Sequence, residues 1–291
     1  MKKKASKMAG IDFGTTLTKV AWLEDDGTYG FLSTAGPFEV IDDWKPANDP
    51  SPHERVSDML WRGGITRAHA IGIGPRRFDR ISLIEFAGDP IENEIRLQSD
   101  GARRLLALEG RSPNSFLLVS VGTGVSYTRV VDGKAERFPY GSALGGGFIA
   151  GLAKISSWRE IYEIDEKIAG AKPLNLLVQD VLPSALGTPI GEFVVAHFGK
   201  DPADDRDGHG PARVMATALH VVATGIVRDV MMMQMMPEHR PSGPLVFIGS
   251  TLATFPTLVR YLEEYARKLG LEMRFPLNGE FSAAIGALHA S

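Results

Sequence analysis

Residues 8–22, Met-Ala-Gly-Ile-Asp-Phe-Gly-Thr-Thr-Leu-Thr-Lys-Val-Ala-Trp, contain the pattern that decides the fold. An apolar run ends at Asp12, a small turn rich in hydroxyl groups follows, and a second alternating apolar run returns. This order predicts a β-hairpin. Gly14 allows close approach of a ligand, the two threonines after it offer donors, and Lys19 adds positive charge. Backbone N–H groups in such turns bind anions, and a lone carboxylate beside them suits a hydrated Mg²⁺. The stretch therefore predicts a phosphate loop with a metal-side aspartate, or else an ordinary hairpin with a tolerant turn.

The same order of strand, small-residue turn and strand returns in the middle of the chain. A compact apolar strand is expected at 115–120, followed by Val121-Gly122-Thr123-Gly124 and a second strand at 125–131. The triple glycine at 145–147 opens a predicted helix, and helix N-termini preceded by glycine bind phosphate well. The alternative for these glycines is tight helix packing. A late strand at 245–248 ends in another small turn, Gly-Ser-Thr.

Glu94 opens a segment with helical spacing that should end before Gly110. Its carboxylate has two interpretations, stabilisation by the helix dipole or a base that faces a cleft. The remaining expected elements are a helix at 52–61, a buried strand at 68–74, a weak strand within 82–93, short helices through 153–200, the long apolar helix Pro211–Met236, an amphipathic helix at 256–269 capped by Gly270, a strand at 272–275 and a small-residue helix at 282–288.

Composition limits the class of protein. The chain has 291 residues with 44% hydrophobic content, which suggests about two domains. A net charge of −3 gives no sign of nucleic-acid or membrane attraction. The absence of cysteine excludes disulfides, thiol nucleophiles and cysteine-ligated iron–sulfur clusters. No uninterrupted apolar stretch reaches the roughly 18 residues typical of a membrane-spanning helix. A soluble cytoplasmic protein is therefore expected.

Taken in this order, the turns resemble those of the sugar kinase, Hsp70 and actin superfamily. The resemblance implies an α/β fold with two ribonuclease-H-like halves and a nucleotide cleft between them, here expected at residues 1–110 and 111–291. Within that superfamily the chain resembles the type II pantothenate kinases from Gly10 to Leu288. The most specific match is the ending Asn278-Gly-Glu-Phe-Ser-Ala-Ala-Ile-Gly-Ala-Leu288.

This resemblance implies an ATP-dependent kinase that phosphorylates the primary hydroxyl of pantothenate, the first step of coenzyme A biosynthesis. Glu94 would be the general base, and Asp12 would hold Mg²⁺. The implied nucleotide contacts are Asp12, Phe13, Gly14, Thr15, Thr16, Leu17, Thr18, Lys19, Thr123, Gly146, Gly147, Phe148, Ile149, Ala150, Tyr162 and Ser250. The family also implies a homodimer formed through the long central helix, here Pro211–Met236.

One departure from the family concerns the acceptor. The family has a substrate-binding arginine ahead of the triple glycine, where this chain has Phe138; the nearest arginine, Arg137, lies one residue earlier. One step along a strand turns a side chain to the opposite face, so a bulge restores Arg137 or the contact is lost. Two further hypotheses therefore stand beside the pantothenate kinase: a kinase of the same fold for another acceptor, such as pantetheine or a sugar, and a non-catalytic dimer that binds nucleotide or coenzyme A.

Overall fold

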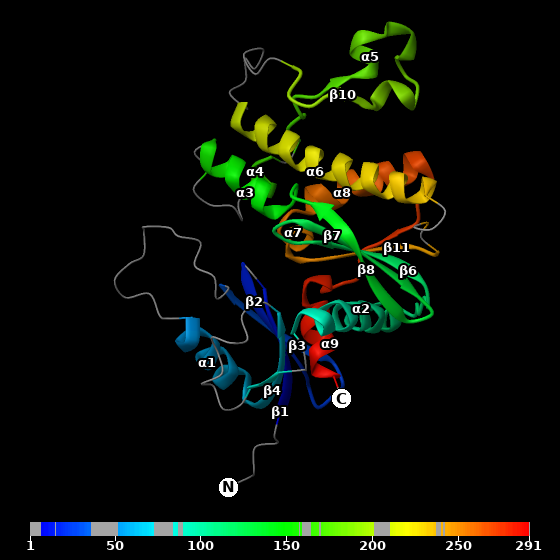
Figure 1. Ribbon diagram of the computed structural model, residues 1–291. Helices are drawn as coiled ribbons and strands as arrows, with labels where there is room; N and C mark the ends of the chain where they lie inside the picture. The colour runs from blue at the N-terminus through cyan, green and yellow to red at the C-terminus, as the bar shows by residue number, and fades with distance from the viewer. Residues whose placement is uncertain are drawn as a thin grey trace. The chain divides into compact units, whose positions relative to one another are not determined.

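The computed structural model describes residues 7–14, 16–35, 52–72, 84–86, 90–156, 158, 164–168, 170–200, 210–236, 240 and 242–290 (Figure 1). The chain forms two compact units that interleave along the sequence. The first comprises Met1–Leu118, Thr128–Phe138 and Phe275–Ser291, and the second comprises Val119–Tyr127 and Pro139–Arg274. The division into halves at residue 110 stays a prediction.

The sheet of the first unit has the strand order β3-β2-β1-β4-β5. Its strands are β1 (Lys7–Phe13), β2 (Leu17–Leu23), β3 (Tyr29–Ala35), β4 (Ile65–Gly72) and β5 (Ile84–Phe86). The first three strands are antiparallel neighbours, and β4 and β5 add to β1 in parallel. The predicted opening hairpin is confirmed, and β4 starts three residues earlier than expected.

The two faces of this sheet are covered by different helices. On one face Ile11 and Phe13 pack with Val56 and Leu60 of α1 (Pro52–Gly63). On the other face lies α9 (Ser282–Leu288), which is so close that a Cβ at Gly10 would overlap the Ala284 carbonyl oxygen. Because side chains alternate along a strand, Asp12 faces the same side as Gly10.

Helix α2 (Pro90–Leu108) covers this second face together with α9. The two helices touch through glycines, since a Cβ at Gly101 would overlap the Ser282 carbonyl and one at Gly286 would overlap the Leu97 carbonyl. The expectation that Glu94 opens this helix is wrong. The helix begins at Pro90, and proline is favoured at the first helical position because it has no N–H to leave unbonded. Glu94 therefore lies one turn inside.

The second sheet repeats the order of the first. Its order is β12-β11-β6-β7-β8, with strands β6 (Phe116–Val121), β7 (Val125–Val131), β8 (Lys134–Ser142), β11 (Leu245–Ile248) and β12 (Met273–Arg274). Three consecutive strands are again neighbours, and β11 lies beside the first of them and pairs in parallel with β12. Asp132 and Gly133 both have positive φ, 49° and 77°, as the predicted β7–β8 hairpin turn requires.

Helices α3 (Gly146–Ile155), α4 (Ile164–Lys167), α6 (Gly210–Met235), α7 (Ser250–Thr254) and α8 (Pro256–Leu269) belong to the second unit. The long helix α6 packs against α8 and α3 (Figure 1). The fully buried Tyr127 of β7 donates a 2.9 Å hydrogen bond to Asp229 of α6. Among the described residues α6 is long and apolar enough to cross a membrane, but 61% of its most apolar window is buried, as in a core helix. The predicted cap of α8 is confirmed, with Gly270 left-handed at φ 66°.

Residues 172–200 form a small excursion on the second unit. Here the expectation of short helices and loops misses a two-stranded sheet, β9 (Leu176–Leu177) with β10 (Val194–Ala196). Between them lie α5 (Val178–Val181) and the 3-10 turns η3 (Pro183–Ala185) and η4 (Ile190–Glu192). His197 ties the excursion to α6, because its ring nitrogens lie 2.9 Å from Asn175 Oδ1 and 2.9 Å from Thr224 Oγ1.

Candidate active site

A cross-strand pair of charges lies next to the turn of the first hairpin. Asp12 on β1 stands directly opposite Lys19 on β2, and Lys19 Nζ lies 3.4 Å from Asp12 Oδ2. Both side chains are about nine-tenths buried, at 10% and 11% exposure. Both face α2, because they share strand faces with Gly10 and Ala21, which pack on the α2–α9 side.

Glu94 of α2 brings a second carboxylate to this pair. Burial raises the pKa of Glu94 to about 7, and the negative charge of Asp12 adds to the rise. The positive charges of Arg137 and Lys19 oppose it. A carboxyl group with this pKa exchanges its proton near neutral pH, which is the property of an effective general base. The charges of Asp12, Lys19 and Arg137 therefore all act on the ionisation of Glu94.

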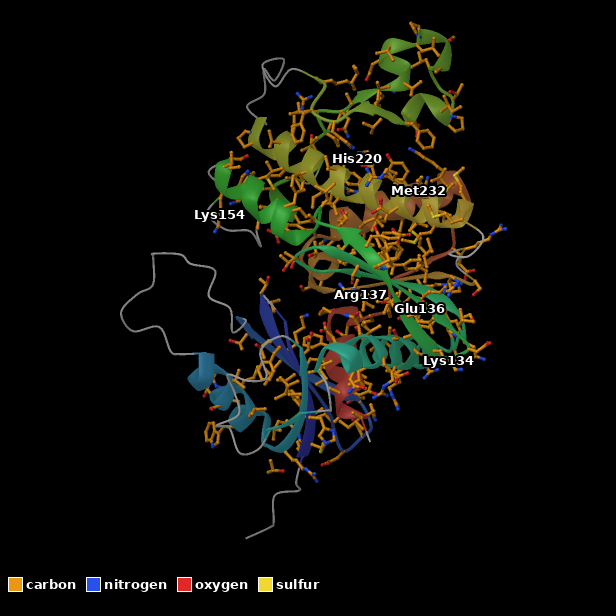
Figure 2. The ribbon with its side chains drawn as sticks, viewed as in Figure 1. Lys134, Glu136, Arg137, Lys154, His220 and Met232 are labelled. Carbon is orange, nitrogen blue, oxygen red and sulfur yellow. The ribbon has the colours of Figure 1, made fainter. Side chains whose placement is uncertain are left out.

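Arg137 and Phe138 take different environments on β8. Phe138 is 6% exposed and belongs to the core, whereas Arg137 is exposed. Glu136, the preceding residue (Figure 2), pairs instead with Arg129 across the hairpin, at 2.8 Å between Arg129 Nη2 and Glu136 Oε2. The guanidinium of Arg137 is thus the positive charge that β8 presents to Glu94.

The first turn presents mainly backbone to any ligand. The side chains of Phe13 and Thr18 are fully buried and lie on the α1 face, away from Asp12. The Gly14 N–H donates to the Leu17 carbonyl at 3.1 Å, which closes the turn. Leu17 is half-buried and Thr16 is exposed. Thr15 lies outside the described residues. Gly72 of β4 has φ +100° and supports the turn from behind, because a Cβ there would lie 2.5 Å from the Phe13 carbonyl.

The second turn, Gly122–Gly124, is stacked on the start of α3. The Gly146 N–H donates to the Gly122 carbonyl and the Gly147 N–H to the Thr123 carbonyl, both at 2.8 Å. The predicted helix start is confirmed. The first two amides of the helix are nevertheless engaged by the turn, so a nucleotide would meet the glycine surfaces rather than these donors.

The other predicted residues of the second unit lie around this turn. Thr123 is exposed, and Phe148 and Ala150 are half-buried, while Ile149 is fully buried and contributes to packing. Ser250 is half-buried at the first position of α7. Tyr162 lies outside the described residues. The sequence interpretation missed Thr251, whose hydroxyl donates to the Gly122 carbonyl at 2.8 Å. The available signal was the pair of hydroxyl residues, Ser250 and Thr251, that follows Gly249 after β11.

The acidic residues suit a cation held mainly by its own water and by phosphate. The described part of the chain contains no group of three or more His, Asp or Glu side chains arranged to hold a metal ion. Mg²⁺ commonly binds one or two carboxylates and keeps several waters or substrate phosphates as ligands. The buried carboxylate of Asp12, beside a turn suited to anions, fits that mode of binding.

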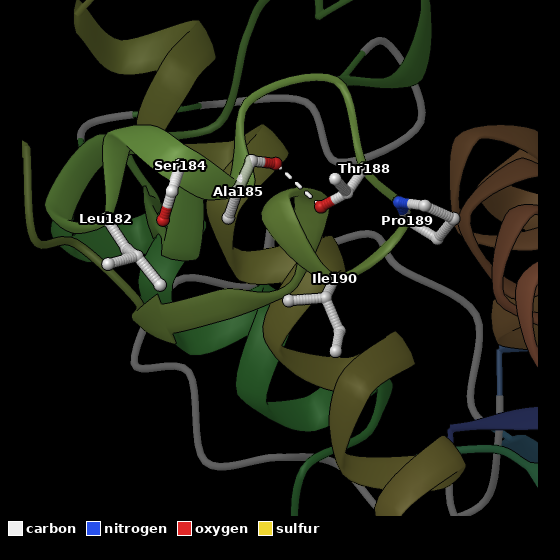
Figure 3. Close-up of a pocket in the computed structure, with 6 residues that line it drawn as sticks. All are labelled: Leu182, Ser184, Ala185, Thr188, Pro189 and Ile190. Carbon is white, nitrogen blue, oxygen red and sulfur yellow. Dashed lines mark hydrogen bonds between the residues drawn. The ribbon is translucent and has the colours of Figure 1, made fainter.

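A surface hollow of about 460 Å³ lies elsewhere, on the 172–200 excursion (Figure 3). Its lining residues are Leu182, Ser184, Ala185, Thr188, Pro189 and Ile190. None of these side chains is charged, and the Thr188 hydroxyl is bonded to the Ala185 carbonyl at 2.7 Å. This hollow has no group for phosphoryl chemistry.

Comparison with known proteins agrees with this geometry. The chain is 28% identical over 284 residues to the type II pantothenate kinase of Staphylococcus haemolyticus, covering 96% of this chain and 98% of the relative. It is 26% identical over 284 residues to a type II pantothenate kinase of Bacillus cereus, covering 96% and 95%. No protein-family model matches the chain. The resemblance to type II pantothenate kinases is thus confirmed over nearly the whole length.

Solved structures support the fold. The activator of the 2-hydroxyisocaproyl-CoA dehydratase from Clostridium difficile, solved with bound ADPNP, matches with a TM-score of 0.61 at 14% identity, covering 98% of this chain and 94% of that one. Component A of the (R)-2-hydroxyglutaryl-CoA dehydratase from Acidaminococcus fermentans matches with a TM-score of 0.61 at 17% identity, covering 98% of both chains. Together with the repeated strand order, these matches confirm the actin-like ATPase fold with two ribonuclease-H-like halves.

Proposed function

We propose that this chain is an ATP-dependent kinase that transfers the γ-phosphoryl group of ATP to the primary hydroxyl of pantothenate, the first step of coenzyme A biosynthesis. The observation that carries the proposal is Glu94, a half-buried carboxyl group whose pKa is raised to about 7 and which is acted on by the charges of Asp12, Lys19 and Arg137. It occurs in a chain similar to type II pantothenate kinases over 96% of its length.

In the proposed mechanism Glu94 is the general base. Its carboxylate accepts the proton of the pantothenate hydroxyl while the hydroxyl oxygen forms a bond to the γ-phosphorus and the bond to the ADP oxygen breaks. A positioned base of this kind contributes about 10²–10⁴-fold to the rate. Burial keeps the carboxylate basic, and the charges of Arg137 and Lys19 keep a useful fraction ionised at neutral pH.

Asp12 would hold Mg²⁺, and Lys19 would keep its carboxylate oriented through their 3.4 Å contact. A bound Mg²⁺ supplies charge neutralisation to the phosphates. Phosphoryl transfer depends mainly on such positioning and electrostatic stabilisation. The backbone of Gly14–Lys19 and the Thr123 turn would contact the phosphates. Gly146–Ala150, Tyr162 and Ser250 would border the remainder of the nucleotide.

Arg137 would bind the carboxylate of pantothenate. A guanidinium suits a carboxylate because it offers paired donors in one plane. The position of Arg137 supports this role, since its charge already acts on Glu94, the group that must meet the acceptor hydroxyl.

The proposal is tested by ADP release from Mg·ATP with pantothenate, pantetheine and glucose offered separately as acceptors. Pantothenate should give the highest kcat/KM, and the product should be the phosphate ester of its primary hydroxyl by mass spectrometry. Turnover with glucose alone would reject the acceptor assignment. ATP binding without turnover on any acceptor would favour the non-catalytic hypothesis.

We further propose a soluble cytoplasmic homodimer formed along α6. Met232 and Met235, at 52% and 78% exposure, offer apolar surface at the C-terminal end of α6. Light scattering after size exclusion should give twice the mass of 31.6 kDa at micromolar concentration. The double substitution Met232→Glu with Met235→Glu should give the monomer mass, and a monomeric wild type would reject the dimer.

A further inference from the structure

In the second unit, three chain segments meet at one backbone oxygen. The Gly122 carbonyl accepts a hydrogen bond from the Gly146 N–H at the start of α3 and another from the Thr251 hydroxyl in the first turn of α7, both at 2.8 Å. A carbonyl oxygen has two lone pairs, so these two donors satisfy it fully. Thr251 is 5% exposed, and its hydroxyl is directed at this oxygen rather than at solvent.

The space around this carbonyl oxygen is too small for additional side-chain atoms. A Cβ at Gly146 would lie 2.5 Å from Thr251 Oγ1 and 3.0 Å from the Gly122 oxygen. Gly249, which precedes α7, has φ +115°, and a Cβ there would overlap the Val121 carbonyl. Gly146 and Thr251 therefore form a matched pair, in which the missing side chain of one makes room for the hydroxyl of the other.

We infer that Thr251 is a positioning residue for nucleotide binding, which holds the Gly122–Gly124 turn in register with the starts of α3 and α7. This inference rests on the proposed function, in which the same three segments border ATP. Thr251 itself is buried, and its hydroxyl bonds the backbone of the turn. Removal of its hydroxyl leaves the Gly122 carbonyl with one donor, and the turn loses the bond that joins it to α7.

The expected effect is selective for the nucleotide. A single hydrogen bond of this kind corresponds to about a 3- to 10-fold change in an equilibrium constant. Thr251→Val keeps the shape of the side chain and should raise the KM for ATP and the dissociation constant for Mg·ADP by about this factor. The KM for pantothenate and the pH midpoint of kcat/KM should stay at the wild-type values, because Glu94 and Arg137 belong to the other unit.

The experiment compares Thr251→Val, Thr251→Ser and Thr254→Val in the full chain, with Mg·ADP titrated by calorimetry beside steady-state kinetics. Thr251→Ser keeps the hydroxyl and should restore wild-type nucleotide affinity. Thr254 lies in the same short helix, but its hydroxyl donates only to the Ser250 carbonyl one turn back, at 2.9 Å. Thr254→Val is therefore the matched control and should bind nucleotide as the wild type does.

A double-mutant cycle gives a second test if Thr251→Val folds poorly. Gly146→Ala should weaken Mg·ADP binding in the wild-type background and weaken it less when combined with Thr251→Ala, because the closest clash disappears. Additive effects would overturn the inference, as would an unchanged KM for ATP in Thr251→Val or equal losses for ATP and pantothenate. A wild type that binds Mg·ADP but leaves pantothenate unphosphorylated would reject the proposed function alone, and the calorimetric comparison would still decide the role of Thr251.

Discussion

Replacement of Glu94 by glutamine should remove most of the kinase activity while leaving the protein folded. Glutamine has nearly the same shape but cannot accept the hydroxyl proton, so kcat should fall by about 10²–10⁴-fold. The KM for ATP should change little, because Glu94 is proposed to act on the acceptor side. Glu109→Gln is a suitable control, since Glu109 lies just beyond the end of α2. Its carboxylate accepts a hydrogen bond from the Leu277 N–H and pairs with Arg111.

The dependence of kcat/KM on pH gives a second, independent check on the role of Glu94 as the base. Burial and the charge of Asp12 raise the pKa of Glu94 to about 7 in the free protein. The base must be ionised, so kcat/KM should be flat above this pH and fall about tenfold for each unit below it. The residual activity of Glu94→Gln should lack this acid limb, whereas Glu109→Gln should retain it.

The same substitution should change stability in the opposite direction to activity. The pKa of Glu94 is higher in the folded state than its ordinary value of 4.5, so the folded protein binds this proton more tightly. That contribution is fully present below pH 4.5 and is lost as the pH rises through about 7. Since glutamine stays neutral, Glu94→Gln should be more stable than wild type at pH 8, by about 1–2 kcal/mol allowing for partial exposure, and equal to it near pH 4.

Steady-state ADP release between pH 5.5 and 8.5 and thermal unfolding between pH 4 and 8.5 would measure both effects. The reasoning would be refuted by a mutant that retains more than about a tenth of the wild-type kcat, since a general base contributes at least about 10²-fold. A wild-type kcat/KM that stays flat from pH 6 to 8 would also refute it, because the carboxylate would then titrate outside this window.

Further predictions concern the acceptor site and the helix packing of the first unit. Arg137→Ala should raise the KM for pantothenate by about 10- to 100-fold with little change in the KM for ATP, as expected for a lost charge-assisted bond; equal losses for both substrates would count against an acceptor role. Gly286→Ala should destabilise the protein by about 1–3 kcal/mol, because its Cβ would overlap the Leu97 carbonyl and force α9 away from α2. In contrast, Gly151→Ala in α3 should be neutral or slightly stabilising in thermal unfolding, since nothing lies within 4 Å of that Cβ; a similar loss in both variants would show that packing is not the cause.

The sequence predicted the features that depend on neighbouring residues. The Asp132-Gly133 turn, the start of α1 at Pro52 and the cap of α8 at Gly270 were all placed correctly. Each depends on the φ preference of one or two residues, which is a local property. The triple glycine likewise marked the start of α3, because three adjacent glycines need a backbone contact to justify their conformational cost.

The missed features depend on contacts between distant segments. Strands β9 and β10 are two and three residues long, too short to show any periodicity. The contacts of His197 with Asn175 and with Thr224 of α6 join residues 22 and 27 positions apart in the sequence. The hydroxyl residues after Gly249 are visible in the sequence, but which carbonyl Thr251 would reach is not, because its partner Gly122 lies 129 residues earlier in the chain. The sequence also did not show that the amides of Gly146 and Gly147 are bonded. Their partners are the carbonyls of Gly122 and Thr123, which only the folded sheet brings next to the start of α3.

The position of the arginine, at 137 rather than 138, determines whether its charge lies at the surface or in the core. At position 138 an arginine would have to place its charge in the core, where Phe138 is 6% exposed, and burial of an unpaired charge is strongly unfavourable. At position 137 the guanidinium stays hydrated and still lowers the pKa of Glu94. The displaced arginine is therefore compatible with acceptor binding without any charge entering the core. The charge that would attract a carboxylate acceptor is the same charge that keeps the proposed base ionised, so loss of Arg137 should both weaken pantothenate binding and move the acid limb of kcat/KM to higher pH.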